Sequence, residues 1–325
     1  MKIRVSALFL ALLICISFLC SCADFVASSG EVSITYEKNN GEAPETLGIS
    51  IFGIERPYHP EREGYIFMGW YKDEACTKPY DFDQTPTHSI TLYAAWRFDA
   101  ESVLNRFVET TQSSTVMINC TFYNATFFGE IVNSKTVSGS GVIIFEDEAS
   151  YYILTNNHVV NNTSGLHNAA YEVVDAYARV HNATLLYRDA AYDLALLSIA
   201  KGKKELSVAP LADAVAPVAT PVIAVGAPNG QINTVSIGSI VDFDKAEIDN
   251  ADAEDNAICF CVLFHDAPIG GGSSGGALFD ERLNLIGINF AATEQDEAFK
   301  LGLAVSADKI RDFLQATTLK KHFPI

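Results

Sequence analysis

Short apolar segments recur from residue 115 to residue 290, and this recurrence limits the fold more than any other feature of the sequence. The segments lie about ten residues apart and are separated by turns that contain Gly or Asn. They are TVMINCTF, GVIIF, YYILT, ATLLYR, LALLSI, PVIAVG, TVSIGSIV, ICFCVLF, GALFD and LIGINF. So many short strands in one region favour a mainly β fold arranged as a pair of barrels.

Other segments mark the limits of this region. Residues 207–221, SVAPLADAVAPVATP, are rich in Ala and Pro and are expected to connect the two halves. Residues 306–319 predict a helix, because their apolar residues share one face. Residues 99–113 predict a helical linker on the N-terminal side, with Asp99 as its cap. We therefore assign residues 114–325 to one domain.

Residues 31–98 form a separate region of short strands. VSITYE, GYIFMGWY and ITLYAAW are rich in aromatic and β-branched residues, and Asn-Asn-Gly or Pro-containing breaks bound them. Both tryptophans of the chain, Trp70 and Trp96, fall here and are expected to anchor a small core. Residues 23–30, ADFVASSG, precede this module as a short tether.

The chain begins with a segment typical of an export signal. Lys2 and Arg4 precede an apolar run of about fifteen residues, which is shorter than the roughly 20 that a membrane span needs. The run ends in LCSC, which resembles a bacterial lipobox, so residues 1–22 are interpreted as a lipoprotein signal peptide with Cys22 as the lipidated residue. An ordinary signal peptide is the alternative. Either kind of signal peptide places the protein outside the cytoplasm, and the lipoprotein signal would also anchor it to the membrane.

Composition excludes several classes of function. Forty acidic residues stand against 22 basic ones, and the net charge of −18 would repel a phosphate backbone, so we expect no nucleic-acid partner. The histidines form no close ligand pair and the cysteines no CxxC arrangement, so we expect no metal site. For Cys120, Cys259 and Cys261 buried thiols are favoured, and a disulfide with Cys120 is left open.

Three segments of the larger domain carry candidate catalytic groups. His158 follows an apolar segment, Asp193 precedes another, and Ser274 lies in the loop GGGSSGG. Taken singly, each has a structural alternative: a histidine at a strand end, a turn aspartate and a flexible linker. Apolar strands flank the glycine loop, however, and the three residues occur in the order His, Asp, Ser. We therefore interpret them as one site.

These residue types suit nucleophilic catalysis. A serine hydroxyl attacks a carbonyl poorly unless a base accepts its proton, and histidine can accept it near neutral pH. A buried carboxylate holds the histidine in the required tautomer. The oxyanion that develops needs N–H donors, and the backbone amides of Gly272 and Ser274 are the candidates, because the glycines allow a tight loop that exposes them.

Residues 114–316 resemble the HtrA/Deg-type, trypsin-like serine proteases. The matching segments are GSGVI at 139–143, TNNHVV at 155–160, DLAL at 193–196, VIAVGAP at 222–228 with Gly230, SIGSIV at 236–241, DA at 266–267 and the serine loop through GIN at 287–289. The resemblance implies a chymotrypsin fold, with the site between two six-stranded barrels. It also implies that His158 is the general base, Asp193 the orienting acid and Ser274 the nucleophile.

Residues 31–98 resemble the Listeria–Bacteroides (internalin B-type) repeat through GYIFMGWY, YDF and TLYAAW. The resemblance implies a small β-grasp-like module of bacterial surface proteins, which acts as a spacer or binds a cell-surface ligand. The fold expected for the chain is thus mainly β: this module, then a chymotrypsin-like double β-barrel with a C-terminal helix. Few residues follow the last helix, so we expect no PDZ domain.

The sequence departs from the protease family pattern in the serine loop. Gly271 and Ser273 stand where the family usually has Pro and Asn, and this predicts an oxyanion hole that is poorly formed at rest. No acid lies six residues before Ser274, so the first substrate pocket is expected to be apolar and to favour cleavage after small or medium apolar residues rather than after Arg or Lys. The expected wall of that pocket is Ala267, Pro268 and Ile269.

The favoured function is a surface-tethered serine endopeptidase that cleaves proteins or peptides through an acyl-enzyme intermediate. We expect no cofactor, because side chains and backbone amides complete the chemistry. Two other classes stay open. One is a catalytically latent pseudo-protease that acts by binding, and the other is an adhesin in which residues 31–98 bind the ligand.

Overall fold

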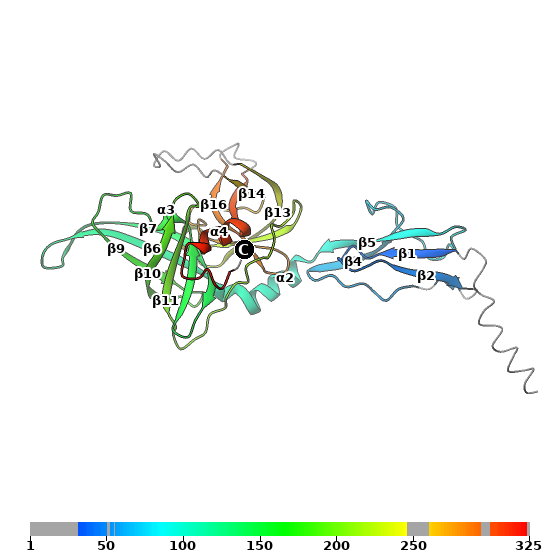
Figure 1. Ribbon diagram of the computed structural model, residues 1–325, viewed down its shortest axis with the longest axis horizontal. Helices are drawn as coiled ribbons and strands as arrows, with labels where there is room; N and C mark the ends of the chain where they lie inside the picture. Colours follow the sequence, from blue (N-terminus) through cyan, green and yellow to red (C-terminus); the bar gives the residue numbers. More distant parts are fainter. Residues whose placement is uncertain (1–31, 51–52, 55, 246–259, 294–299, 324–325) are drawn as a thin grey trace, which may run out of the picture. The chain divides into compact units, whose positions relative to one another are not determined.

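The computed structural model describes residues 32–50, 53–54, 56–245, 260–293 and 300–323 (Figure 1). The chain divides after Phe98 into two compact units, residues 1–98 and 99–325. Strands dominate the described part of each unit, which confirms the predicted mainly β fold.

The described part of the first unit is a sheet of five strands in the order β3-β2-β1-β5-β4. The strands are β1 (Ser33–Glu37), β2 (Glu45–Ser50), β3 (Gly53–Ile54), β4 (Tyr65–Tyr71) and β5 (Ile90–Phe98). Strands β1 and β5 are parallel, whereas the other neighbouring pairs are antiparallel.

The core of this sheet is aromatic. Tyr36 of β1 and Trp70 of β4 are buried, and their rings meet edge to face with centroids 4.9 Å apart. Trp96 packs against the same cluster, and its indole N–H donates to the carbonyl of Lys38 at 2.8 Å. Buried aromatic pairs of this geometry contribute beyond their area alone. The expectation that both tryptophans anchor the core is confirmed.

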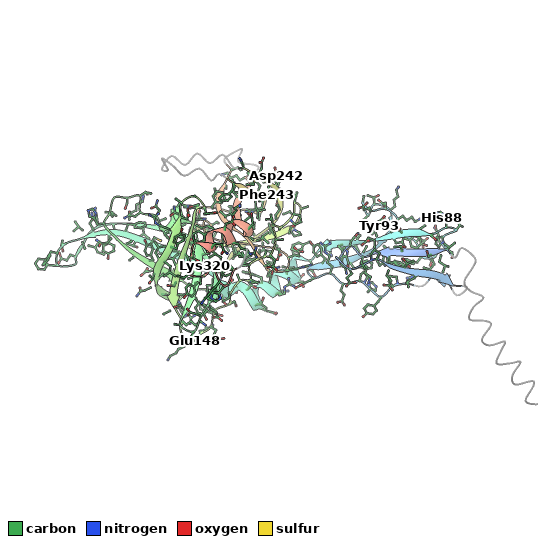
Figure 2. All side chains as sticks on the ribbon, viewed as in Figure 1. His88, Tyr93, Glu148, Asp242, Phe243 and Lys320 are labelled. Atoms are coloured by element: carbon green, nitrogen blue, oxygen red, sulfur yellow. The ribbon has the colours of Figure 1, made fainter. Side chains whose placement is uncertain are left out.

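A cavity of about 540 Å³ lies at β5 and the segment before it. Two of its lining residues, His88 and Tyr93, are labelled in Figure 2. Lys72 and Tyr80 line it as well, and the Lys72 ammonium lies 5.6 Å from the centroid of the Tyr80 ring. The cavity is therefore partly aromatic and carries a cationic side chain.

The second unit begins with the predicted helical linker. Helix α2 (Ala100–Arg106) starts at Asp99, whose carboxylate accepts a hydrogen bond from the backbone N–H of Ser102 at 3.3 Å. A five-residue π-helical turn (Phe107–Thr111) and a short 3₁₀ turn (Gln112–Ser114) lead into the first barrel. Asp99 thus supplies the N-terminal cap that the sequence predicts.

The first barrel closes in the order β10-β11-β8-β7-β6-β9 among the described residues. Its strands are β6 (Thr115–Ala125), β7 (Ile131–Glu146), β8 (Ser150–Thr155), β9 (Asn168–Val174), β10 (Val180–Asp189) and β11 (Leu194–Ala200). Alternate residues of β6, such as Val116, Ile118, Cys120 and Phe122, are buried and pack in the barrel core. This period of two is what a strand with one interior face requires.

The second barrel closes in the order β12-β13-β14-β17-β16-β15, again for the described part of the chain. Its strands are β12 (Pro221–Gly226), β13 (Thr234–Lys245), β14 (Cys261–His265), β15 (Ala277–Phe279), β16 (Leu285–Ala292) and β17 (Gly302–Ser306). Residues 207–220 of the expected connection lie between β11 and β12, and Pro221 already begins β12. Helix α4 (Ala307–Gln315) follows β17, and its Ile310, Phe313 and Leu314 are buried.

The pattern of apolar segments in the sequence does not predict two strands that the structure contains, β9 and β17. Strand β9 reads NAAYEVV, and most of its first residues are exposed, so it lacks a continuous apolar run. Strand β17 reads GLAVS and is buried throughout, but it is short and rich in small residues. The predicted helix at 306–319 is also too long, because regular α-helix covers only Ala307–Gln315.

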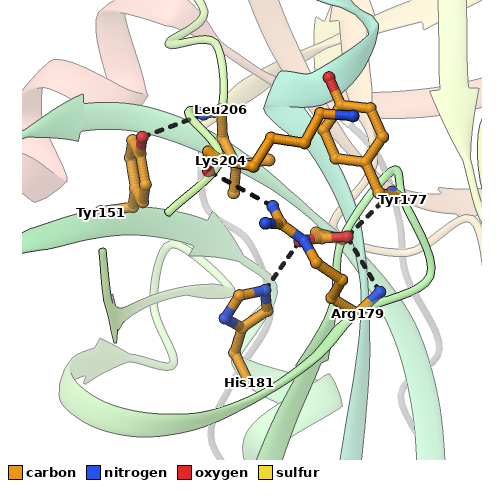
Figure 3. A network of polar contacts seen from close by, with 7 residues as sticks. Tyr151, Tyr177, Arg179, His181, Lys204 and Leu206 are labelled. Carbon is orange, nitrogen blue, oxygen red and sulfur yellow. Dashed lines mark hydrogen bonds and ion pairs between the residues drawn. The ribbon is translucent and has the colours of Figure 1, made fainter. Parts of the chain in front are cut away.

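A buried carboxylate holds the turn between β9 and β10 (Figure 3). The side chain of Asp175 is fully buried, and its Oδ2 accepts hydrogen bonds from Arg179 Nε at 2.7 Å and from His181 Nε2 at 2.8 Å. Its Oδ1 accepts the backbone N–H of Tyr177 at 2.9 Å. Buried charges are stable only when they are paired in this manner.

Candidate active site

Two strands of the first barrel bring His158 and Asp193 together. Strands β8 and β11 are antiparallel, with Ala195 opposite Thr155. His158 lies in the one-turn helix α3 (Asn157–Val160) just after β8, and Asp193 lies just before β11. Antiparallel neighbours place the end of one strand beside the start of the other, so the two residues meet at one end of the barrel.

The two side chains are in direct contact. Asp193 Oδ2 lies 2.7 Å from His158 Nδ1, and Asp193 Oδ1 accepts the backbone N–H of His158 at 2.9 Å. An ionised carboxylate can only accept hydrogen bonds, so Nδ1 carries the ring proton. The Nε2 atom of the neutral ring therefore has its lone pair free. The histidine side chain is 45% exposed and the aspartate 14%, so the pair opens to solvent on the histidine side.

Two asparagines hold the backbone of Asp193. Its carbonyl accepts the backbone N–H of Asn157 at 3.1 Å and the side-chain amide of Asn156 at 2.9 Å. Asp193 itself has a φ of +50°, a left-handed conformation that few residues other than glycine adopt. The hydrogen bonds to its carbonyl and carboxylate stabilise this conformation and point the side chain at His158.

The serine loop lies between β14 and β15 and begins with a tight turn. The Ser273 N–H donates to the Gly270 carbonyl at 2.9 Å, and Gly272, the third residue of this turn, has a φ of +98°. This pattern is that of a type II turn, which requires glycine at its third position. A Cβ at Gly272 would also lie 2.7 Å from the Ala227 carbonyl oxygen, so the position admits only glycine without rearrangement.

The orientation of the loop amides bears on the predicted oxyanion hole. The Gly271 carbonyl accepts the Asn229 N–H at 3.0 Å, and in a trans peptide the following N–H, that of Gly272, points the opposite way. Within the described part of the chain the N–H groups of Gly272 and Ser274 donate to no protein atom, and neither does that of the exposed Gly271. The amides of the residues that alternate with them, Ser273 and Gly275, are both paired. Two amides at the predicted positions are thus free to bind a ligand oxygen.

The Ser274 hydroxyl is close to β16 rather than paired with the histidine. Its Oγ donates to the Phe290 carbonyl at 3.4 Å, and the described hydrogen bonds include none between Ser274 and His158. The two sides of the site nevertheless meet at Gly139. A Cβ there would lie 2.7 Å from the Val159 side chain, next to His158, and 3.1 Å from the Ser274 carbonyl.

The predicted wall of the substrate pocket divides into two parts. Ala267 is fully buried in the core of the second barrel, whereas Pro268 and Ile269 line a cavity of about 40 Å³ beside Ser273. A space of this size holds little more than one water molecule. Asp266 Oδ1 accepts the Ser239 N–H at 2.6 Å and so ties β14 to β13.

The cysteines, possible metal ligands and possible membrane-spanning helices were also considered in the sequence. Cys76, Cys120 and Cys261 carry free thiols, while Cys22 and Cys259 lie outside the described residues. Across the described ranges no three His, Cys, Asp or Glu side chains cluster as metal ligands would. No helix there is both long and apolar enough to cross a membrane.

Sequence reasoning missed two residues that touch the serine loop. Ser140 of β7 bonds to the carbonyls of Gly272 and Ser274, and Asn229 bonds to that of Gly271. Ser140 lies in GSGVI, a segment that carries the family resemblance, and Asn229 lies between Pro228 and Gly230, which belong to another such segment. Their contacts join the loop to segments far away in the chain, and no local pattern shows such contacts.

Comparison with known proteins identifies the class of each domain. Residues 139–288 match the trypsin-like peptidase domain family, and residues 33–95 match the Listeria-Bacteroides repeat domain family. The fold is also that of the Rv3671c protease from M. tuberculosis in its active form, with a TM-score of 0.54 and 23% identity over 68% of this chain and 87% of that one. The predicted double barrel is thereby confirmed.

Three similar bacterial proteins indicate which trypsin-like proteases this chain resembles. The probable periplasmic serine endoprotease DegP-like of Buchnera aphidicola is 32% identical over 205 residues, or 61% of this chain and 40% of the relative. The periplasmic serine endoprotease DegP of Salmonella typhimurium is 34% identical over 54% of this chain and 34% of the relative. The Serine protease Do-like HtrA of Bacillus subtilis is 30% identical over 55% of this chain and 39% of the relative.

The chain spans less than half the length of these relatives. Its residues 139–288 match the trypsin-like peptidase domain family, and this part of the chain is similar to DegP and HtrA serine endoproteases. One Listeria-Bacteroides repeat precedes that domain in the sequence.

Proposed function

We propose that this protein is an extracytoplasmic serine endopeptidase in which Ser274 is the nucleophile, His158 the general base and Asp193 the orienting acid. The observation that carries the proposal is the contact between His158 Nδ1 and Asp193 Oδ2 at 2.7 Å, which leaves Nε2 able to accept a proton. The matches to serine endoproteases support the same reaction class.

The reaction begins with a change of rotamer. In the proposal the Ser274 hydroxyl turns from the Phe290 carbonyl towards His158 by rotation about its Cα–Cβ bond. His158 Nε2 accepts the hydroxyl proton while Oγ forms a bond to the substrate carbonyl carbon. Asp193 stabilises the imidazolium that results and remains ionised.

The negative charge that forms on the substrate carbonyl oxygen needs donors. In the proposal it accepts hydrogen bonds from the N–H groups of Gly272 and Ser274, which have no acceptor in the described part of the protein. Loss of one such donor typically costs about 100- to 1,000-fold in kcat. The free state of both amides supports an oxyanion hole that is formed at rest, despite Gly at 271 and Ser at 273.

Collapse of the tetrahedral intermediate completes the first half of the reaction. The peptide C–N bond breaks, His158 gives its proton to the leaving amine, and the acyl group stays on Ser274 as an ester. A water molecule then gives a proton to His158 and attacks the ester, and the serine regains its proton as the acid product leaves. The balance needs no metal or cofactor.

For substrates we propose cleavage after small or medium apolar residues, with Ala267, Pro268 and Ile269 at the first pocket. Position 268, six residues before Ser274, is a proline and not an acid. A library of peptides that varies the residue before the cleaved bond tests this specificity. Preferential cleavage after Arg or Lys would contradict it.

For location we propose a lipid anchor at Cys22 that holds the protein on the outer side of the membrane. The support is the LCSC motif after an apolar run and the word "periplasmic" in the names of two relatives. Mass spectrometry of the N-terminal peptide, with Cys22→Ser as the comparison, tests the anchor. An unmodified N-terminus at another residue would show ordinary signal cleavage.

The decisive test of activity is labelling by a fluorophosphonate probe. The protein expressed from the full chain is compared with its Ser274→Ala and His158→Ala variants. Loss of either residue in a working triad costs about a million-fold in turnover, so only the parent should be labelled and only the parent should degrade casein. A parent that is neither labelled nor active would contradict the proposal.

One observation favours a latent form of the same domain. The Ser274 hydroxyl faces the Phe290 carbonyl and makes no hydrogen bond to His158 in the described structure. In a pseudo-protease this arrangement would persist, and the protein would act by binding alone. Binding of a protein ligand with no labelling of the parent would favour this function over the enzyme.

A different observation favours an adhesin. The cavity of about 540 Å³ in the repeat unit offers Tyr80, Tyr93, Lys72 and His88 to a ligand. If this unit performs the function, deletion of residues 31–98 abolishes binding to cells or cell walls, while Ser274→Ala leaves binding unchanged. The opposite pattern, lost proteolysis in Ser274→Ala and unchanged binding in the deletion, favours the enzyme.

A further inference from the structure

Ser140 lies in the first barrel, yet its polar groups face the serine loop that belongs to the second. It is fully buried on β7. Its backbone N–H donates to the Ser274 carbonyl at 2.7 Å, and its hydroxyl donates to the Gly272 carbonyl at 2.7 Å. One residue therefore binds the carbonyls of both residues whose amides form the proposed oxyanion hole.

The direction of the Ser140 hydroxyl is determined by its neighbours. The Ala227 N–H donates to Ser140 Oγ at 2.8 Å. Since an amide N–H can only donate and the Gly272 carbonyl can only accept, the single hydroxyl proton must lie on the Gly272 side. The Ser140 carbonyl is bound too, by the Thr155 hydroxyl at 2.7 Å. Ser140 is thus a rigid donor to the loop.

Both peptide groups that flank Gly272 are held by these contacts. The group between Gly271 and Gly272 is bound at its oxygen by the Asn229 N–H. The group between Gly272 and Ser273 is bound at its oxygen by Ser140 and at its nitrogen by the Gly270 carbonyl. The Gly272 N–H belongs to the first of these planar groups, which Asn229 holds, while Ser140 holds the second. Together the two bonds restrict rotation on both sides of the Gly272 Cα and so restrict where the Gly272 N–H points.

The serine loop depends on hydrogen bonds from outside the loop to keep one backbone conformation. Gly270, Gly271 and Gly272 are consecutive, and glycine has the largest choice of backbone conformations of any residue. Nothing in the side chains of this run restricts rotation of the peptide groups. Without the bond from Ser140, the part-buried carbonyl of Gly272 and the buried amide of Ala227 would both lose their described partner.

We propose that Ser140 is a positioning residue of the active site, which holds the Gly272 amide in the orientation that stabilises the oxyanion. The inference rests on the proposed serine endopeptidase function. Ser140 touches no substrate and acts through the loop. It therefore affects the rate of the chemical step and leaves initial binding of the substrate or probe nearly unchanged.

The test measures fluorophosphonate labelling of the full chain at several probe concentrations, which separates the maximal rate kinact from the half-saturating concentration KI. In Ser140→Ala we expect kinact to fall about tenfold, the effect of leaving buried hydrogen-bonding groups unpaired, and KI to stay within twofold. Complete loss of the Gly272 donor sets the upper limit of about 1,000-fold. Casein hydrolysis should fall by the same factor as kinact.

Thr115→Val is the matched control. Thr115 is buried on β6, and its Oγ1 lies 2.9 Å from the Gln112 carbonyl oxygen and 2.6 Å from Asn233 Oδ1, neither of which belongs to the serine loop. It should lower the melting temperature about as much as Ser140→Ala and leave kinact unchanged. If Ser140→Ala melts below the assay temperature, Ser140→Cys replaces it, because a thiol keeps the volume and remains a weak donor.

The outcomes separate this inference from the function on which it rests. A parent that is never labelled overturns the proposed function itself. A parent that is labelled, with a folded Ser140→Ala whose kinact lies within twofold of it, overturns the role of Ser140 alone. An equal fall of kinact in Thr115→Val would show a general effect of stability and would also overturn it.

Discussion

Asp193 binds His158 through both of its carboxylate oxygens: Oδ2 accepts the ring Nδ1–H at 2.7 Å, and Oδ1 accepts the backbone N–H at 2.9 Å. The backbone bond holds the histidine residue in place, and the ring bond determines its tautomer. Two donors face one side chain, so only a group with two acceptor atoms satisfies both.

Replacing Asp193 by Asn should therefore invert the tautomer of the histidine. The Asn oxygen would take the backbone N–H of His158, and its NH₂ group would face Nδ1, which must then be the unprotonated nitrogen. Nε2 would carry the proton and could not accept one from Ser274. We expect kcat to fall about 10⁴-fold, the loss typical of this change in a Ser-His-Asp triad, as measured by casein hydrolysis.

Asp189→Asn is the control for this change. Asp189 lies at the end of β10, and its carboxylate accepts only the Ala191 N–H at 2.8 Å among the described contacts, a role that an Asn oxygen can also fill. Activity should stay within twofold of the parent. Circular dichroism would show whether both variants are folded, and a folded Asp193→Asn with more than a tenth of parental activity would contradict the assigned role.

The two neighbouring glycines of the serine loop should respond differently to alanine. At Gly272 a Cβ would meet the Ala227 carbonyl at 2.7 Å in a backbone with φ of +98°, whereas at Gly271 it would meet nothing within 4 Å. Gly272→Ala must therefore shift the turn that orients its own amide, and we expect at least a 100-fold loss of kcat, as for loss of one oxyanion donor. Gly271→Ala should keep nearly full activity.

A proline at position 271 tests the conformation of the serine loop in the free protein. Gly271→Pro restores the residue usual in the family, and the Gly271 N–H donates to no described atom, so nothing is lost by its removal. Because proline restricts the unfolded chain, we expect a slightly raised melting temperature with activity retained. Equal loss of activity in Gly271→Ala and Gly272→Ala would contradict the turn described for this loop.

How much of this site the sequence predicts depends on whether a contact is local. The positions of His158 and Asp193 follow from strand order, because each is adjacent to an apolar segment that the pattern identifies. Ser140 could not be found in the same way, because its bond to Gly272 joins residues 132 positions apart in different barrels. Strand β9 was missed for a related reason: its first residues are exposed, and its place is set by pairing with β6 and β10.

Cys120 should be unreactive in the folded protein. It is fully buried in the first barrel, and burial raises the pKa of its thiol to about 12. Since the thiolate is the reactive form, iodoacetamide at pH 8 should modify the partly exposed Cys261 and spare Cys120 until urea unfolds the domain. Peptide mass spectrometry distinguishes the two sites, and equal rates without urea would contradict the packing described for β6.

Asp175 should make the stability of the first barrel depend on acid. Burial by itself raises the pKa of its carboxyl, but hydrogen bonds from His181, Arg179 and the Tyr177 N–H outweigh it and lower that pKa below its usual value. A lowered pKa in the folded state means that the stabilisation is present above the unfolded pKa of about 4 and is lost as the pH falls through the folded value. Asp175→Asn should thus lower the free energy of unfolding by about 2 kcal/mol at pH 7, since it removes the charge that accepts these hydrogen bonds.

Urea unfolding of parent and variant at pH 7, 5 and 3 measures this effect. The difference between the two proteins should shrink from pH 5 towards pH 3, because Asp175 of the unfolded parent chain then takes up a proton that the folded state binds less readily. Asp213→Asn is the control: the Asp213 side chain is fully exposed, and its only described ion pair is with Arg311 at 3.4 Å, so this variant should unfold at the same urea concentration as the parent at each pH. A difference that grew from pH 5 to pH 3 would contradict the lowered pKa of Asp175, and the network around it would then need a different assignment of protons.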